Sequence, residues 1–145
     1  MLDMLDVLFK MSLYLSHTAR IGNCETQIAW NGVEAITSNG EHDELYEFRD
    51  ALKAIGSTEK LGVIEKVIKL YESVHGRKAD QDEAFDIGDS HGEELNKLDS
   101  EYYKLNEDLD ELCLALAQKS IEELENIKKD AFDSELAQNT LDKLN

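Results

Sequence analysis

Apolar side chains recur at intervals of three and four residues along most of this chain, and no proline interrupts the pattern. Because an α-helix turns once every 3.6 residues, side chains at these intervals lie on one face of a helix. Proline breaks such a helix and glycine weakens it, and the chain has no proline and only eight glycines. The sequence therefore predicts an all-α fold, a bundle of about six or seven helices. The length of 145 residues and the apolar content of 41% suffice for one hydrophobic core, so we expect a single domain over residues 1–145.

Two helices are predicted in the first 38 residues. The first ends near Ser16 or His17. Its buried face is expected to follow the residues spaced by three and four, which are Leu2, Leu5, Leu8 or Phe9, Ser12 or Leu13, and Ser16. The second helix is expected over 25–38, where Gly32 weakens it and the run 38–40 stops it. Its largest apolar side chain is Trp30, which we interpret as core or interface packing.

A short-looped helical hairpin is predicted over residues 43–75. Its first helix spans about 43–55, and Gly56 is placed to cap the C-terminus. Ser57 is then expected to cap a second helix over about 58–75. The expected core side chains of the hairpin are Leu45, Phe48, Leu52, Ile55, Leu61, Ile64, Val67 or Ile68, and Tyr71.

A long acidic loop is predicted over 77–92, between the fourth and fifth helices, because Phe85 and Ile87 are its only large apolar residues. The fifth helix is expected over 93–105, with Leu95, Leu98, Tyr102 and Leu105 buried. Asn106 is the expected N-cap of a long sixth helix that begins at Glu107. Its expected buried stripe is Leu109, Leu112 or Cys113, Leu116, Ile121, Leu124 and Ile127. A last amphipathic piece with Phe132, Leu136, Leu141 and Leu144 either continues this helix or forms a separate one.

Negative charge is concentrated in one part of the chain. Thirteen of the 32 acidic residues lie within 79–111, where Lys97 and Lys104 are the only basic residues, so this segment carries −11 of the formal net charge of −17. Like charges repel and do not promote folding, so such a cluster favours a basic partner. The alternative is an acidic surface that only keeps the protein soluble.

Carboxylates three or four residues apart on a helix lie about 5–6 Å from one another and form a compact anionic edge. Arginine binds carboxylates in the bidentate way in which it binds phosphates. The candidate partner-binding residues are Asp86, Asp89, Glu93, Glu94, Glu101, Glu107, Asp108, Asp110 and Glu111. The alternative for Glu93, Glu94, Glu107 and Asp108 is a structural role, because acidic residues in the first turn of a helix interact favourably with its dipole.

Catalytic, metal-binding and nucleic-acid-binding patterns are absent from the sequence. It has no phosphate-binding loop, no nucleophile elbow and no zinc-binding helix motif. The acidic run from Asp80 does not fit a calcium loop, because Ala84, Phe85 and His91 occupy ligand or glycine positions. We therefore expect no catalytic residue, no metal and no cofactor. The basic group of Lys66, Lys69, Arg77 and Lys78 is expected to balance the acidic region, and direct nucleic-acid binding is not expected at this net charge.

A cytoplasmic location without membrane contact is expected. The apolar N-terminus carries Asp3 and Asp6 where a signal peptide requires positive charge. Its apolar run is also shorter than the roughly 20 residues that a membrane-spanning helix needs. Cys24 and Cys113 belong to no metal-ligand pattern, and we expect both to be reduced and packed.

Two segments, ALKAIGSTEKLGVIEKVIKLY (51–71) and LNKLDSEYYKLNEDLDELCLALAQKS (95–120), resemble the two most recognisable blocks of a bacterial DNA-mimic protein family, a domain long catalogued as being of unknown function. A third block of that family is similar to residues 30–39, where Gly32 and Asn39 are kept in register and Val33 replaces a phenylalanine. The likeness covers about 25–120, which leaves 121–145 as a C-terminal extension. It implies an all-helical and often dimeric protein that occupies the DNA-binding surface of a helix-turn-helix repressor. Other members of the family are suspected immunity proteins for secreted toxins.

The sequence thus leads to three functional hypotheses. The first is stoichiometric blocking of the basic surface of a DNA-binding protein, a transcription regulator or a nuclease, by DNA mimicry. The second is an immunity protein that neutralises a cognate secreted toxin. The third is an enzyme that uses paired carboxylates. A homodimer and a monomer both remain open.

Overall fold

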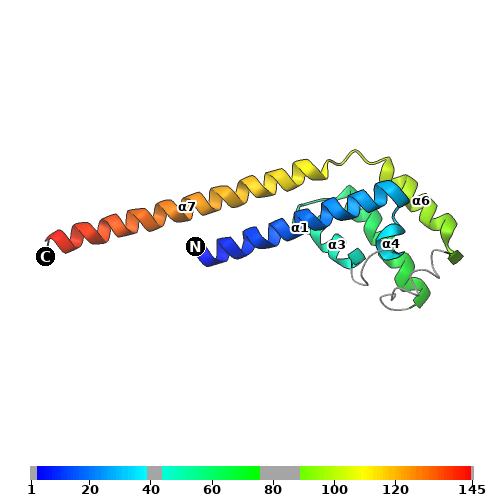
Figure 1. Cartoon of the computed structure of the whole chain (residues 1–145), viewed down its shortest axis with the longest axis horizontal. Helices are drawn as coiled ribbons and strands as arrows, with labels where there is room; N and C mark the ends of the chain where they lie inside the picture. The colour runs from blue at the N-terminus through cyan, green and yellow to red at the C-terminus, as the bar shows by residue number, and fades with distance from the viewer. Residues whose placement is uncertain (1–2, 39–43, 76–88, 145) are drawn as a thin grey trace.

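The computed structural model describes residues 3–38, 44–75 and 89–144. These residues form helices and no strand, which confirms the predicted all-α class. The helices are α1 (Met4–Asn31), α2 (Ala35–Ser38), α3 (Glu44–Ala54), α4 (Glu59–His75), α6 (Gly92–Tyr103) and α7 (Leu109–Leu144). Helix α3 packs on α1, α4 packs on α3 and α6 packs on α4, all toward the C-terminal end of α1 (Figure 1). Helix α7 runs antiparallel to α1 and extends well beyond its N-terminus.

Helix α1 is continuous over 28 residues, so the predicted break near Ser16 or His17 is wrong. Between 17 and 25 the residue that disfavours a helix most is Gly22, which costs about 1 kcal/mol relative to alanine. Burial of Ile21 and Cys24 on the core face outweighs this cost. The helix ends at Gly32, so the segment expected to form the second helix is divided between the end of α1 and the short α2.

The apolar stripe predicted to be the buried face of the first helix points to solvent over its described residues. Leu5 is 75% exposed and Phe9 is 71% exposed, whereas Val7 on the opposite face is fully buried. The N-terminal half of α1 carries apolar residues on both faces, and only the face that includes Val7 is buried. Helix α7 packs alongside α1. The periodicity identified a helix correctly, but the wrong face was assigned to the core.

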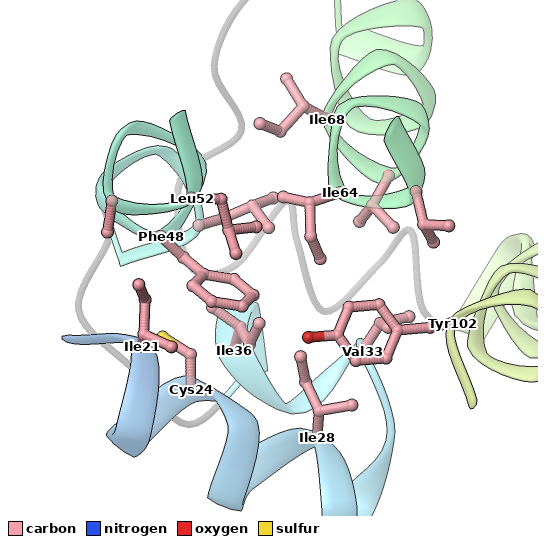
Figure 2. Close-up of a cluster of buried hydrophobic side chains, with 14 of the residues drawn as sticks. Ile21, Cys24, Ile28, Val33, Ile36, Phe48, Leu52, Ile64, Ile68 and Tyr102 are labelled. Atoms are coloured by element: carbon pink, nitrogen blue, oxygen red, sulfur yellow. The ribbon is translucent and has the colours of Figure 1, made fainter. Parts of the chain in front are cut away.

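The hydrophobic core lies where α1, α3, α4 and α6 meet (Figure 2). Its central side chains are Ile21, Cys24, Ile28, Val33, Ile36, Phe48, Leu52, Ile64, Ile68 and Tyr102. The predicted core positions Leu45, Phe48, Leu52, Ile55, Ile64, Val67, Ile68, Tyr71, Leu95 and Tyr102 are all buried. Leu61, Leu98 and Leu105 pack partly buried around them.

The hairpin of α3 and α4 forms as predicted, with helix ends within one residue of the expected bounds. Gly56 adopts a φ of +81° after α3, and its N–H donates to the Lys53 carbonyl at 3.1 Å. The Ser57 hydroxyl accepts a hydrogen bond from the Leu61 N–H at 3.2 Å, which is the capping role expected for it. Local sequence signals were sufficient here because the turn is only a few residues long.

The C-terminal half corrects where the predicted helices begin and end. Most of the loop expected over 77–92 lies outside the described residues, and α6 begins at Gly92. Helix α7 begins at Leu109 instead of Glu107. The residue that caps it is Asp108 and not the expected Asn106, because the Asp108 carboxylate accepts a hydrogen bond from the Glu111 N–H at 3.0 Å. The helix then continues without a break for 36 residues, so the last amphipathic piece continues the sixth predicted helix. The described helices therefore divide the chain differently from the six or seven that were predicted.

Candidate partner-binding surface

The described members of the candidate set lie at two separate places. Asp89, Glu93 and Glu94 are exposed around the N-terminus of α6, and we call them the α6 acidic group. Asp108, Asp110 and Glu111 are exposed at the N-terminus of α7, and we call them the α7 acidic group. Glu101 and Glu107 are half-buried between the two groups, and Asp86 lies outside the described residues.

Helix α6 separates the two acidic groups. Its 12 residues rise about 18 Å along the axis. Lys97 and Lys104 are exposed along this stretch, and the Lys66 ammonium pairs with the carboxylate of Glu101. Part of the basic group that was expected to balance the acid therefore does so within one molecule. The described candidate carboxylates form two groups, and the stretch between them also carries positive charge.

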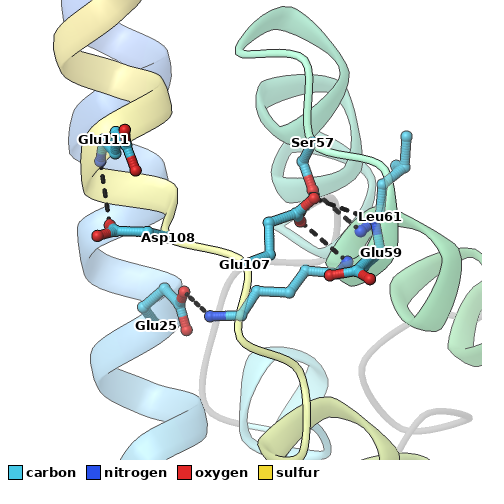
Figure 3. Close-up of polar contacts among 8 residues, drawn as sticks. Glu25, Ser57, Glu59, Leu61, Glu107, Asp108 and Glu111 are labelled. Atoms are coloured by element: carbon cyan, nitrogen blue, oxygen red, sulfur yellow. Dashed lines mark hydrogen bonds and ion pairs between the residues drawn. The ribbon is translucent and has the colours of Figure 1, made fainter.

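Glu107 caps helix α4 from a position about 50 residues further along the chain (Figure 3). Its carboxylate accepts hydrogen bonds from the backbone N–H groups of Thr58 at 2.9 Å, Lys60 at 3.0 Å and Glu59 at 3.1 Å, and from the Ser57 hydroxyl. The first N–H groups of any helix have no partner within the helix, and a carboxylate near them also interacts favourably with the helix dipole. Glu107 thus fastens the segment between α6 and α7 to the start of α4.

This capping makes the stability of the fold depend on pH. Burial raises the pKa of the Glu107 carboxyl, but the hydrogen bonds from Ser57, Thr58, Lys60 and Glu59 outweigh burial and lower the pKa to about 2. Because an unfolded glutamate titrates near about 4.3, the stabilisation is present above that pH and is lost as the pH falls toward 2.

Replacing Glu107 by glutamine is therefore expected to lower the free energy of unfolding by about 1–2 kcal/mol at neutral pH. Urea denaturation followed by circular dichroism at pH 7 and near pH 2.5 should show the difference from wild type shrinking in acid. The matched control is Glu111→Gln, because the exposed carboxylate of Glu111 accepts no hydrogen bond from the described residues. An equal loss of stability at both pH values would contradict the capping role of the charged carboxylate.

The α7 acidic group has a different character from Glu107. Asp108 uses one oxygen to cap its own helix, and Asp110 and Glu111 form no ion pair with any described residue. Lys60, at the start of α4, is paired with Glu25 at 2.8 Å. These carboxylates offer only hydrogen-bond acceptors to solvent, which is the arrangement that arginine and lysine side chains recognise.

Two further residues lie near this end of the molecule: Trp30, interpreted from the sequence as core or interface packing, and Asp99, to which the sequence assigned no role. Trp30 is 82% exposed at the C-terminal end of α1, not packed in the core of this chain. It lies off the buried face of α1 that carries Ile21, Cys24 and Ile28, so its helical register could have indicated its exposure. Asp99 turns inward, because its carboxylate accepts from the Val33 N–H at 3.1 Å.

The described surface offers little that is typical of a catalytic centre. An apolar groove of about 170 Å³ lies between α1 and α7, and a larger open groove between α4 and α6 is lined by Lys66, Lys69, Lys97 and Glu94. Within 3–38, 44–75 and 89–144, no cluster of three His, Cys, Asp or Glu side chains has the arrangement of a metal site. None of the helices in these ranges is long and apolar enough to span a bilayer.

Comparison with known proteins bears directly on the resemblance noted from the sequence. A family model described as DMP19-like protein matches residues 17–122, from the middle of α1 to the first third of α7. Neither a curated protein nor a solved structure matches the chain. The matched span contains the hydrophobic core, the α4 cap and both acidic groups, and it confirms the resemblance to a DNA-mimic family. The chain belongs to the DMP19-like protein family.

Proposed function

We propose that this protein is a non-catalytic DNA mimic that covers the basic surface of a DNA-binding protein, a transcription regulator or a nuclease. The observation that carries this proposal is the α7 acidic group, in which Asp108, Asp110 and Glu111 present exposed carboxylates that no described cation neutralises. The dipole of α7 stabilises each of these charges by about 1 kcal/mol or less and leaves them unneutralised, whereas a basic partner would neutralise them. Membership of the DMP19-like family supports the same function.

The spacing of the two acidic groups suits a surface that binds duplex DNA. The helix between them rises about 18 Å, a length over which duplex DNA presents roughly ten phosphate charges. A partner that grips DNA over half a helical turn can therefore contact both groups. We assign direct contacts to the α6 and α7 acidic groups together with Asp86, and a supporting position to Glu101 and Glu107, which are engaged within the chain.

The double variant Asp110→Lys/Glu111→Lys is expected to weaken binding of the partner by tenfold or more, because two favourable charge contacts become repulsive. The protein is immobilised and used to capture partners from lysate of its source cell at low salt. Bound protein is then eluted in parallel with high salt and with duplex DNA. We expect a basic DNA-binding protein that is released by both treatments, and that the variant fails to retain.

The matched control is Asp50→Lys/Asp142→Lys, which changes the net charge equally at exposed sites on α3 and at the end of α7. This control should capture the same partner. A partner that both double variants retain equally, and that neither salt nor DNA displaces, would contradict DNA mimicry.

Trp30 favours the second candidate, an immunity protein for a toxin. A tryptophan that is almost fully exposed is the type of residue that anchors tight protein interfaces. Under this hypothesis the acidic groups steer the encounter and Trp30 holds the complex, so binding survives high salt. Trp30→Ala would then abolish capture, whereas it should weaken a charge-dominated DNA-mimic complex only slightly.

A further inference from the structure

Helices α4 and α6 pack against each other, and an open groove of about 480 Å³ lies between them. Its charged lining residues are Lys66, Lys69, Glu94 and Lys97, and Leu70 and Leu98 line it as well. A second open groove of about 390 Å³ follows along α6, with Lys97, Glu101 and Lys104 as its charged residues. Because Lys97 lines both grooves, they meet there, and we call the combined surface the lysine groove.

Positive charge predominates in the lysine groove, although the chain as a whole has a formal net charge of −17. Lys69, Lys97 and Lys104 are exposed and form no ion pair with any residue in 3–38, 44–75 and 89–144. The fourth lysine of the lining pairs with Glu101. Among the described residues, Glu94 is the one further carboxylate that lines the groove. The lysine groove therefore has unneutralised positive charge to offer to a ligand.

The lysine groove also has an apolar part. Leu70 of α4 and Leu98 of α6 line it, and both are partly buried. Val74, one turn further along α4, is 41% exposed. The methylene stems of the lysines enlarge this apolar area, because a lysine keeps its stem on the protein and its ammonium in water. A ligand that fills the groove must therefore supply apolar groups as well as negative charge.

An acidic peptide meets both requirements better than a nucleic acid does. A phosphodiester backbone carries a charge at every nucleotide and no apolar group, and a net charge of −17 repels it. A peptide can place carboxylates at the lysines and apolar side chains over Leu70 and Leu98. Lys97 and Lys104 are two turns apart, about 10 Å along α6, which is the length of about three residues of an extended peptide.

The position of the lysine groove indicates where such a peptide comes from. Glu93, Lys97 and Lys104 lie on one face of α6 by the helical period. Glu94 lines the groove and also belongs to the α6 acidic group, and Lys104 precedes the α7 acidic group by four residues. A partner that contacts both acidic groups therefore lies over the lysines between them. Basic residues of the partner would be repelled there, whereas carboxylates would be attracted.

From this arrangement we propose that the lysine groove binds an acidic peptide segment with apolar side chains, which the partner carries beside the basic surface that contacts the two acidic groups. The groove is then a specificity determinant. It repels a DNA-binding surface that is basic throughout and attracts one that an acidic segment interrupts. Duplex DNA makes no such distinction, because its row of phosphates is unbroken. The assignment of the segment to the partner rests on the proposed function, but the preference of the groove for acidic peptides does not.

Peptide selection on the full chain tests this preference without the partner. A phage-displayed library of short random peptides is depleted on Lys69→Gln/Lys97→Gln/Lys104→Gln and then selected on the wild type. The three glutamines remove exposed charges and no described ion pair, so the fold should be kept. We expect the selected peptides to combine Asp or Glu with apolar residues. A selection without enrichment, or one that enriches basic or uncharged peptides, would overturn the proposal.

The affinity of a selected peptide is then measured by fluorescence anisotropy. The triple glutamine variant is expected to bind it about tenfold more weakly, because three exposed charge contacts are lost. The matched control is Lys128→Gln/Lys129→Gln/Lys143→Gln, which removes the same charge at exposed sites on α7 and should bind like wild type. Equal affinities of the two triple variants would contradict the site. Displacement of the peptide by oligothymidylate would assign the groove to nucleic acid and would also contradict it.

Capture from lysate distinguishes this proposal from DNA mimicry alone. If only the acidic groups bind the partner, the triple glutamine variant loses a repulsion and releases the partner at higher salt than wild type does. If the lysine groove binds an acidic segment, the same variant releases the partner at lower salt. Release at unchanged or higher salt would refute the assignment of the segment to the partner. Failure of the proposed function is shown by Asp110→Lys/Glu111→Lys instead, so the two can fail separately.

Discussion

Replacing Glu44 by alanine is expected to lower the free energy of unfolding by about 3 kcal/mol. Glu44 is the first residue of α3, and its side chain is only 4% exposed. Its carboxylate accepts hydrogen bonds from Gln27 at 3.0 Å, Asn23 at 3.1 Å and Arg20 at 3.3 Å, all on α1. Removing it leaves several donors at the α1–α3 interface without their common acceptor.

The neighbouring Cys24 is part of the same contact. Burial, followed by the nearby Glu44 carboxylate, raises the pKa of its thiol to about 12, so the thiol stays protonated and donates toward Glu44 at 3.7 Å. The sequence identified Cys24 as reduced and packed, and the structure adds this polar contact.

The loss of stability in Glu44→Ala is measured by urea denaturation at neutral pH, and the melting temperature should fall by on the order of 10 °C. The matched control is Glu47→Ala, since Glu47 also pairs with Arg20 but is 48% exposed. Exposed ion pairs contribute about 1 kcal/mol or less, so the control should change little. Equal losses for the two variants would show that burial of the Glu44 carboxylate is unimportant.

Replacing Gly32 by alanine is expected to lower the free energy of unfolding by roughly 2–3 kcal/mol. Gly32 ends α1 with φ of 81° and ψ of 177°, a backbone region that side chains with a Cβ avoid. An added Cβ would also lie 3.2 Å from the Asp99 carboxylate. That carboxylate has little freedom to retreat, because it accepts the hydrogen bond from the Val33 N–H that joins α6 to this turn.

The control for Gly32→Ala is Gly22→Ala, in the middle of α1, where an added Cβ meets no atom within 4 Å. Alanine favours a helix over glycine by about 1 kcal/mol, so this variant should be more stable than wild type. Denaturation of both variants under one condition gives the comparison. A Gly32→Ala variant as stable as wild type would mean that the end of α1 relaxes without strain.

The core side chains in Figure 2 include some that the sequence predicted to be buried and some that it did not. Phe48, Leu52, Ile64 and Ile68 were assigned to the core from the periodicity of two helices joined by a short turn. Val33 and Ile36 are also fully buried, but they lie in a turn and in the four-residue α2, which are too short for a periodic pattern. They are buried because α1 ends at Gly32, where the chain turns and continues into α2.

The candidate surface was predictable in composition but not in arrangement. The excess of acid in 79–111 is a property of the sequence, and the exposed α6 and α7 acidic groups come from it. Glu107 and Asp99 belong to the same acidic segment, yet both bind backbone N–H groups that lie far away along the chain. No spacing rule within one helix can reveal such a contact.

The all-α class, the α3–α4 hairpin, the buried faces of the helices around the core and the strongly acidic character of 79–111 could all be predicted from the sequence alone. These features depend on interactions within a few residues, such as helical periodicity, capping and local charge. Tertiary packing was needed to establish which face of α1 is covered, where Glu107 and Asp99 bind, and that Trp30 and the last part of α7 are exposed. Each of these side chains suits more than one environment. Neighbours that are distant in the sequence and come close only after folding decide which environment it occupies.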